Sequence, residues 1–301
     1  MNKNDCNSVS NFGAFRLGIG LGNCTNLNYL RLNIIGNKIN AQGATNLGNG
    51  LGKSIKLEHI EINLNNNDIG DQGLSGLAEG RSSCRNLQTL TLGLWMNNLT
   101  DGGASTFGSS IAKCSSLQNL SLTLNNNSVG DLGISNLAFG LQKCSQIQML
   151  KLGLCKNQIN ALGISSLGEG LKKCKSLQHL SLKLNDNQIS DEGITALSKG
   201  LQECYELKIL IIDLSGENQI GNIGIAALSM MISKLKNLIS IEINLKGLFQ
   251  PPTSCSYAAG KKQKHLQPIA ENYKIKIPIY WCLAMAEQAS LACILEQTSK
   301  K

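Results

Sequence analysis

Leucine and isoleucine recur along this chain at positions that repeat every thirty residues. Within residues 174–203, apolar side chains alternate with others from Leu180 to Leu184, and this period of two predicts a half-buried strand. Leu197 and Leu201 follow at helical spacing, so the second half of the segment is expected to form a helix. The same order recurs thirty and sixty residues earlier. One strand–helix unit, repeated along most of the chain, therefore predicts the architecture.

Asparagine and aspartate mark the turns of each unit. Asn187 follows the predicted strand, and an amide that both donates and accepts can satisfy backbone groups in its own turn and the next one. It recurs in phase at Asn37, Asn67, Asn97, Asn127 and Asn157. This regularity indicates a structural ladder and not a binding site. Asp191 occupies the position where the N-cap of the following helix is expected.

Glycine makes the predicted helix weak on its own. Gly193 and Gly200 lie in or near it, and each costs roughly 0.5–1 kcal/mol relative to alanine. A strand and a helix of this size also cannot bury an apolar face alone. The helices are therefore expected to be held by packing onto neighbouring units.

The repeat divides the chain into three parts. Residues 1–22 match the second half of a unit and predict either a partial N-terminal repeat that acts as a cap, or an internal start within a longer protein. Residues 23–250 carry repeats with eight predicted strands, and one extra residue falls in the turn after Leu214. Residues 251–301 leave the repeat and predict a basic linker followed by a C-terminal helix, which would cover the last strand.

The unit C-x-x-L-x-x-L-x-L-x-L-x-x-N-x-I-x-D-x-G-I-x-x-L-x-x-G-L resembles a leucine-rich repeat, and most closely the ribonuclease-inhibitor-like subfamily. The long unit, the glycine about six residues after the asparagine and the helical second half carry this resemblance. An extra Leu-x before the asparagine departs from the usual pattern and lengthens the strand. The resemblance implies an α/β solenoid shaped as a horseshoe, with parallel strands on the concave face and helices on the convex face.

Charge argues against nucleic acid as a partner. The formal net charge is +8, but residues 253–301 hold seven lysines and three glutamates, and the rest of the chain is close to neutral for its length. No basic stripe is evident along the repeats, so no nucleic-acid partner is expected. The apolar segment 277–296 is interrupted by Pro278, Glu287 and Gln288, so no membrane partner is expected either.

Cysteine usage predicts a reducing compartment. Six of the eleven cysteines share one phase just before the strand: Cys24, Cys84, Cys114, Cys144, Cys174 and Cys204. Ser54 and Leu235 replace them at the same phase, so no pairing is required, and small buried thiols are expected. Residues 1–21 contain no continuous apolar stretch typical of a signal peptide. These features favour the cytoplasm.

Catalytic, cofactor and metal sites are not expected. Gly52-Lys53-Ser54 resembles the end of a phosphate-binding loop, but that motif requires glycine at position 47, which is leucine. His59 and His179 share a phase yet lie four units apart, too far to bind one metal ion. No nucleophile, base and orienting group occur together. We therefore expect no enzymatic activity and no cofactor.

The variable positions between the inward leucines are the candidate binding surface. They should line the concave face, and the candidates for partner contact are Tyr29, Arg31, His59, Glu61, Trp95, Lys151, Lys183 and Asp213. Trp95 replaces an asparagine found at this position in other units. Two interpretations of it carry equal weight, a binding hot spot and a cover over the next turn.

These observations favour a monomeric, non-catalytic scaffold that binds a protein partner. The resemblance also implies two alternatives. One is a regulator of an enzyme, either a ribonuclease inhibitor or an activator of a Ran-type GTPase. An inhibitor of basic ribonucleases should be acidic, and this body is slightly basic. The other is the sensor or targeting part of a larger receptor or kinase.

Overall fold

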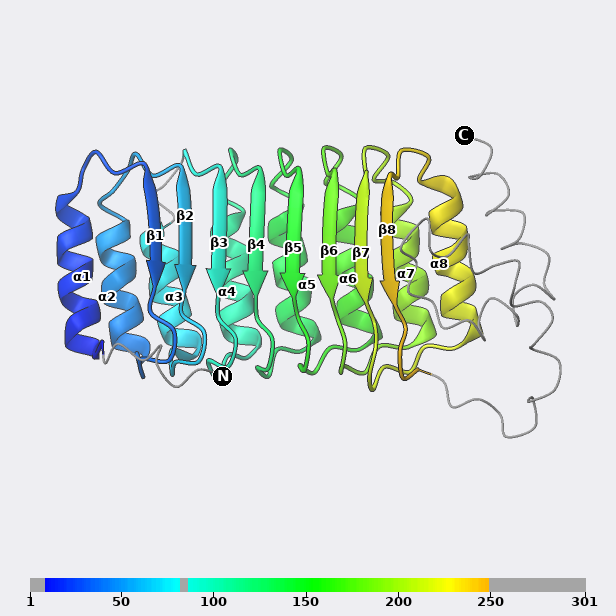
Figure 1. Cartoon of the computed structure of the whole chain (residues 1–301), viewed down its shortest axis with the longest axis horizontal. Coiled ribbons are helices and arrows are strands. Elements are labelled where there is room, and N and C mark those ends of the chain that lie inside the picture. Colours follow the sequence, from blue (N-terminus) through cyan, green and yellow to red (C-terminus); the bar gives the residue numbers. More distant parts are fainter. Residues whose placement is uncertain (1–8, 82–85, 249–301) are drawn as a thin grey trace.

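A computed structural model describes residues 9–81 and 86–248 of the 301-residue chain. In these residues eight helices alternate with eight strands (Figure 1). The helices are α1 (Asn11–Asn23), α2 (Ala41–Leu51), α3 (Gly70–Arg81), α4 (Asp101–Ile111), α5 (Asp131–Leu141), α6 (Ala161–Leu171), α7 (Asp191–Leu201) and α8 (Asn222–Lys234). The strands are β1 (Tyr29–Asn33), β2 (His59–Asn63), β3 (Thr89–Gly93), β4 (Asn119–Thr123), β5 (Met149–Gly153), β6 (His179–Lys183), β7 (Ile209–Asp213) and β8 (Ser240–Asn244). The helix expected within residues 251–301 and Cys84 lie outside the described residues.

All eight strands form one parallel sheet in sequence order. Each residue pairs with the residue thirty positions on, as Leu150 does with Leu180. The step becomes thirty-one between β7 and β8, where Leu210 pairs with Ile241, because of the extra residue in the turn after Leu214. The helices all cover the same face of the sheet (Figure 1). The expected α/β solenoid of repeated strand–helix units is therefore confirmed.

The core lies between the sheet and the helices. In each strand the second and fourth side chains point into it, and Leu180 and Leu182 are fully buried. Leu197 and Leu201 of α7 complete this layer from the helix side. The layer is built almost wholly from leucine and isoleucine, with Phe107 as its one large aromatic among the described residues. Stacked units thus share a continuous interior that no single unit could bury.

The asparagines form the predicted ladder, but it runs toward the preceding unit and not toward the next one. Asn67 Oδ1 accepts hydrogen bonds from the backbone N–H of Asn37 (3.1 Å) and Ile39 (2.9 Å). Its Nδ2 donates to the carbonyl of Ile34 (3.0 Å) in that same unit and to Leu64 (2.8 Å) in its own turn. One buried side-chain amide therefore supplies hydrogen-bond partners for backbone groups of two turns that have no backbone partner.

The expected N-cap role of Asp191 is wrong in its details. Ser190 is the N-cap of α7, and Asp191 is the first residue of that helix. The Asp191 carboxylate instead accepts hydrogen bonds from the backbone N–H of Gly221 (2.7 Å) and Gly224 (2.8 Å), at the start of α8. Asp101 and Asp131 act in the same way on the helices that follow them. Because parallel helices lie side by side, each carboxylate caps the next helix and links adjacent units.

Glycine allows the helices to approach one another closely. A Cβ atom on Gly200 would lie 2.1 Å from the carbonyl oxygen of Gly168 in the preceding helix. The equivalent position in α2 is Gly50, where a Cβ atom would lie 2.1 Å from the carbonyl oxygen of Gly18. These backbones are therefore in direct contact, which supports the expectation that packing holds the helices.

Candidate protein-binding surface

The face of the sheet opposite the helices is the candidate binding surface. Among the described residues no helix or strand covers it (Figure 1). It presents the first, third and fifth side chains of every strand, because neighbours along a strand point to opposite faces. We call this surface the strand face. It has three zones along the array.

The first zone lies on β1 and β2 and contains two cross-strand pairs. The Tyr29 and His59 rings are tilted against each other with centroids 6.3 Å apart. Two residues further along the same strands, Arg31 Nε lies 3.1 Å from Glu61 Oε2, and the Arg31 side chain is well exposed. Four of the eight predicted residues are thus neighbours at the N-terminal end of the strand face. An exposed ion pair of this kind contributes little to stability, about 1 kcal/mol at most.

The second zone, on β3 and β4, is polar and uncharged. Its outward side chains are Thr89, Thr91, Asn119, Ser121 and Thr123. Trp95 follows β3 and is half-buried, and its backbone N–H donates to Asn65 Oδ1 at 2.8 Å. Gly93, two residues earlier, has no side chain, and a Cβ atom there would lie 2.9 Å from Asn65 Oδ1 and 3.0 Å from Asn63 Oδ1. Hydroxyl groups, amides and one aromatic ring suit contacts with uncharged polar groups of a partner.

The third zone, on β5 to β7, carries charges of both signs. Lys151 and Lys183 are exposed, and Lys183 is in register with Asp213 on the next strand. His179 lies in this zone as well, and burial together with the nearby Lys151 lowers its pKa. Its Nε2 atom is buried and makes no hydrogen bond within the described residues. His179 therefore remains neutral to a lower pH than an ordinary histidine.

The eight predicted residues all map to the strand face or its lower margin, but they do not form one cluster. The first zone holds Tyr29, Arg31, His59 and Glu61; the third holds Lys151, Lys183 and Asp213; Trp95 adjoins the uncharged zone between them. Alternation along the strands also places Thr91, Ser121 and Thr123 on this face, but single threonines and serines do not by themselves indicate a binding zone. Whether these residues contact a partner stays a prediction.

The cysteines support the expected structural role. Cys114, Cys144, Cys174 and Cys204 are buried, and the last three are free thiols. The Cys144 thiol donates to the carbonyl of Ile111 (3.3 Å) in the preceding unit. Burial raises the pKa of Cys144, Cys174 and Cys204 to about 12 from the ordinary 9.0. Cys24 differs and is exposed, because the described chain places no unit before α1.

Raised thiol pKa values predict a loss of stability in alkali. The folded protein holds the neutral thiol, whereas the unfolded chain releases its proton above pH 9.0, so the free energy of unfolding should fall as pH rises from 9.0 toward 12. Urea unfolding below and above pH 9.0 measures this fall. The Cys174→Ala variant should show a shallower pH dependence than the parent protein. An equal slope in both would contradict the assignment to the buried thiols.

Metal-binding side chains are scattered over the described residues. No group of three or more histidine, cysteine, aspartate or glutamate side chains comes together there as a potential metal site. His59 and His179 lie on β2 and β6, with three strands between them. Within the same residues, no helix combines the length and the apolarity needed to cross a membrane.

Two segments of the chain match a known repeat family. Residues 57–78 and 173–198 match the family described as Leucine Rich repeat. No curated protein matches the chain. Among solved structures, an internalin (inlF) from Listeria monocytogenes str. 4b F2365 is similar, with 19% sequence identity over 77% of this chain and 84% of that chain and a TM-score of 0.27. The ribonuclease-inhibitor-like subfamily stays a prediction.

Proposed function

We propose that the chain is a non-catalytic scaffold of leucine-rich repeats that binds a partner protein on the strand face. One observation carries this proposal. The residues that repeat in every unit are buried in the core or the turns, and the side chains that differ between units are presented together on an uncovered sheet. A rigid frame with variable exposed positions is the arrangement by which repeat proteins recognise partners.

The chemistry of the three zones constrains the partner. A partner with mixed charge would pair with Arg31 and Glu61 at one end and with Lys183 and Asp213 at the other. Its central part would be polar and uncharged, to match the hydroxyl and amide side chains of β3 and β4. Trp95 is the candidate hot spot, because an aromatic side chain offers a large contact area at a position where other units carry asparagine.

The test compares two faces of the same molecule. Trp95→Ala and Lys183→Glu change the strand face, and Leu162→Ala and Lys199→Glu make the same kind of change at exposed positions on the helices. The immobilised protein is used to capture partners from the source cell, and retained proteins are mapped by cross-linking. We expect cross-links on the strand face and at least a tenfold loss of affinity for the first pair alone. Cross-links confined to the helices, or equal losses for both pairs, would overturn the proposal.

The finer alternatives have direct assays. A ribonuclease inhibitor would slow RNA hydrolysis by a purified ribonuclease, and an activator would accelerate GTP turnover by a Ran-type GTPase. A sensor or targeting part of a larger receptor or kinase would be joined to further domains in the transcript. The free thiols described above favour a reducing compartment such as the cytoplasm for any of these roles.

A further inference from the structure

The fold gathers lysines along one margin of the array. The turns that follow the helices and precede the strands all lie on one margin, the upper one in Figure 1. We call this margin, from the last helical turn to the residue before each strand, the basic edge. Its lysines are Lys53, Lys56, Lys113, Lys143, Lys172, Lys173, Lys175, Lys199, Lys208, Lys234 and Lys236. Five glutamates share it, so the lysines are in clear excess.

The opposite margin has the reverse character. There the strands end and the helices begin, and the acidic residues include Asp68, Asp71, Asp101, Asp131, Asp191 and Glu217. Several of these carboxylates cap helices, as Asp131 and Asp191 do. The near-neutral total of the repeats therefore hides a separation of charge between two margins.

Helix dipoles explain only part of this separation. The negative end of each helix favours a nearby cation, but the effect falls off within the last turn. Among helices α2, α4, α5 and α6, none has a basic residue in its last turn. Lys113, Lys143 and Lys173 lie beyond the helix ends at one shared position of successive units, exposed and without a salt bridge among the described residues. Their charge is available to a partner.

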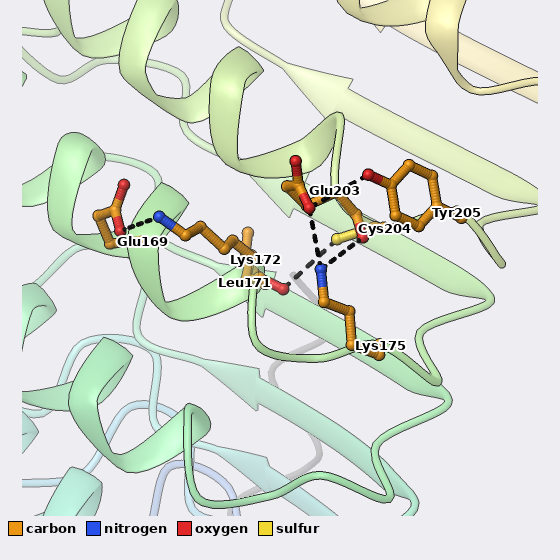
Figure 2. A network of polar contacts seen from close by, with 7 residues as sticks. All are labelled: Glu169, Leu171, Lys172, Lys175, Glu203, Cys204 and Tyr205. Atoms are coloured by element: carbon orange, nitrogen blue, oxygen red, sulfur yellow. Dashed lines mark hydrogen bonds and ion pairs between the residues drawn. The ribbon is translucent and has the colours of Figure 1, made fainter.

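Lysines at one part of the edge are already paired. Figure 2 shows Lys172 with Glu169 (2.8 Å) and Lys175 with Glu203 (3.1 Å), and the Tyr205 hydroxyl also donates to Glu203 (3.2 Å). Both ion pairs are largely exposed to solvent, so they are weak and can open. They reduce the local excess of charge near α6 and α7 without removing it.

Exposed apolar side chains lie among the lysines. Ile55, between Lys53 and Lys56, is 61% exposed, and Ile239 is 76% exposed. The Phe139 and Tyr205 rings are also exposed. Lys143 Nζ lies 5.5 Å from the centroid of the Phe139 ring, and Lys175 Nζ lies 5.4 Å from that of Tyr205. Lysine beside aliphatic and aromatic side chains is the combination that suits the boundary between lipid headgroups and acyl chains.

We propose that the basic edge docks on the surface of an anionic lipid bilayer. The turns stand in a row along one side of the elongated array, so several can touch a plane at once (Figure 1). Anionic headgroups would pair with Lys113, Lys143 and Lys173, and Ile55 and Ile239 would enter the interface. The phosphates of a nucleic acid would pair with the lysines, but the exposed aliphatic side chains would stay in water. An anionic bilayer provides partners for both kinds of side chain.

Docking on a bilayer would contradict the expectation of no membrane partner. That expectation rested on the interrupted apolar segment 277–296, and no basic stripe was expected along the repeats. Docking by the edge would leave the strand face free, so the proposed protein partner and the bilayer would be bound at the same time.

Vesicle co-sedimentation of the full chain tests the proposal. We expect binding to phosphatidylcholine vesicles only when they contain phosphatidylserine, and loss of binding at high NaCl concentration. The triple variant Lys113→Glu, Lys143→Glu and Lys173→Glu should bind at least about tenfold more weakly. Ile55→Ser together with Ile239→Ser should weaken binding at low salt, because the apolar contribution is lost.

The matched control has the same change in charge at other sites. Lys38→Glu, Lys156→Glu and Lys246→Glu alter three exposed lysines of the opposite margin, and both triple variants keep the lysines of residues 253–301. This control should bind within about twofold of the parent protein, and circular dichroism should show both variants folded. Equal weakening in both triples, no dependence on phosphatidylserine, or edge-dependent binding to duplex DNA without binding to vesicles would overturn the proposal.

Discussion

The Gly200→Ala variant is expected to unfold more easily than the parent protein, by roughly 1–3 kcal/mol. Intrinsic helix propensity predicts the opposite, a gain of about 1 kcal/mol. The structure decides between these effects, because the added Cβ atom would lie 2.1 Å from the carbonyl oxygen of Gly168 and 2.8 Å from its Cα atom. Backbone atoms of a packed helix cannot move aside as a flexible side chain can, so α7 would have to shift away from α6.

Gly20→Ala is the matched control. Gly20 holds the same position in α1, but nothing lies within 4 Å of the Cβ atom it would gain. Only the higher helix propensity of alanine changes stability at this position, so the free energy of unfolding should rise by about 0.5–1 kcal/mol. Urea unfolding followed by circular dichroism measures both variants. If Gly200→Ala were also stabilising, contact between the helix backbones would not limit packing.

Asn187→Ala is expected to cost about 3 kcal/mol, since it leaves several buried backbone groups without partners. Asn187 Oδ1 accepts from the N–H of Ile159 (3.2 Å), and its Nδ2 donates to the carbonyls of Leu154 (2.9 Å) and Leu184 (3.0 Å). The side chain is almost completely buried. Its loss should weaken both its own turn and the attachment of the preceding unit.

Asn49→Ala removes the same side chain from an exposed site on α2. Its stability should be unchanged or slightly higher, because alanine is the better helix former and no buried hydrogen bond is lost. Chemical denaturation measures the free energy of unfolding of both variants. Hydrogen exchange of the Ile159 amide should rise in Asn187→Ala and not in Asn49→Ala. A small effect at Asn187, close to that at Asn49, would show that water replaces the amide fully.

Most of the fold follows from periodicity. The alternation from Leu180 to Leu184 predicts strand β6 to within one residue at each end, and the spacing of Leu197 and Leu201 places α7. Eight strands at steps of thirty residues, with one step of thirty-one, were predictable for the same reason. Each unit repeats the same local signals, so an ambiguous signal in one copy is resolved by the others.

The candidate site was predictable only as a face. Alternation along the strands indicates that Arg31, Glu61 and Lys183 point away from the core, whatever lies near them. The pairing of Arg31 with Glu61 depends on the register of two strands thirty residues apart, and register comes from the shared packing of whole units. The binding role of these residues stays a prediction for the strand-face variants to test.

The sequence by itself determined the repeating unit, its strand and helix, the leucine core and the positions of the ladder asparagines, but not the unit toward which the ladder runs. These features arise from neighbours in the chain and from one repeated pattern. Only the tertiary structure decided that Asp191 caps α8 and not its own helix, and that Gly200 is required by the backbone of α6. Each of these depends on the distance between adjacent units, which close packing of their helices sets and no single unit encodes.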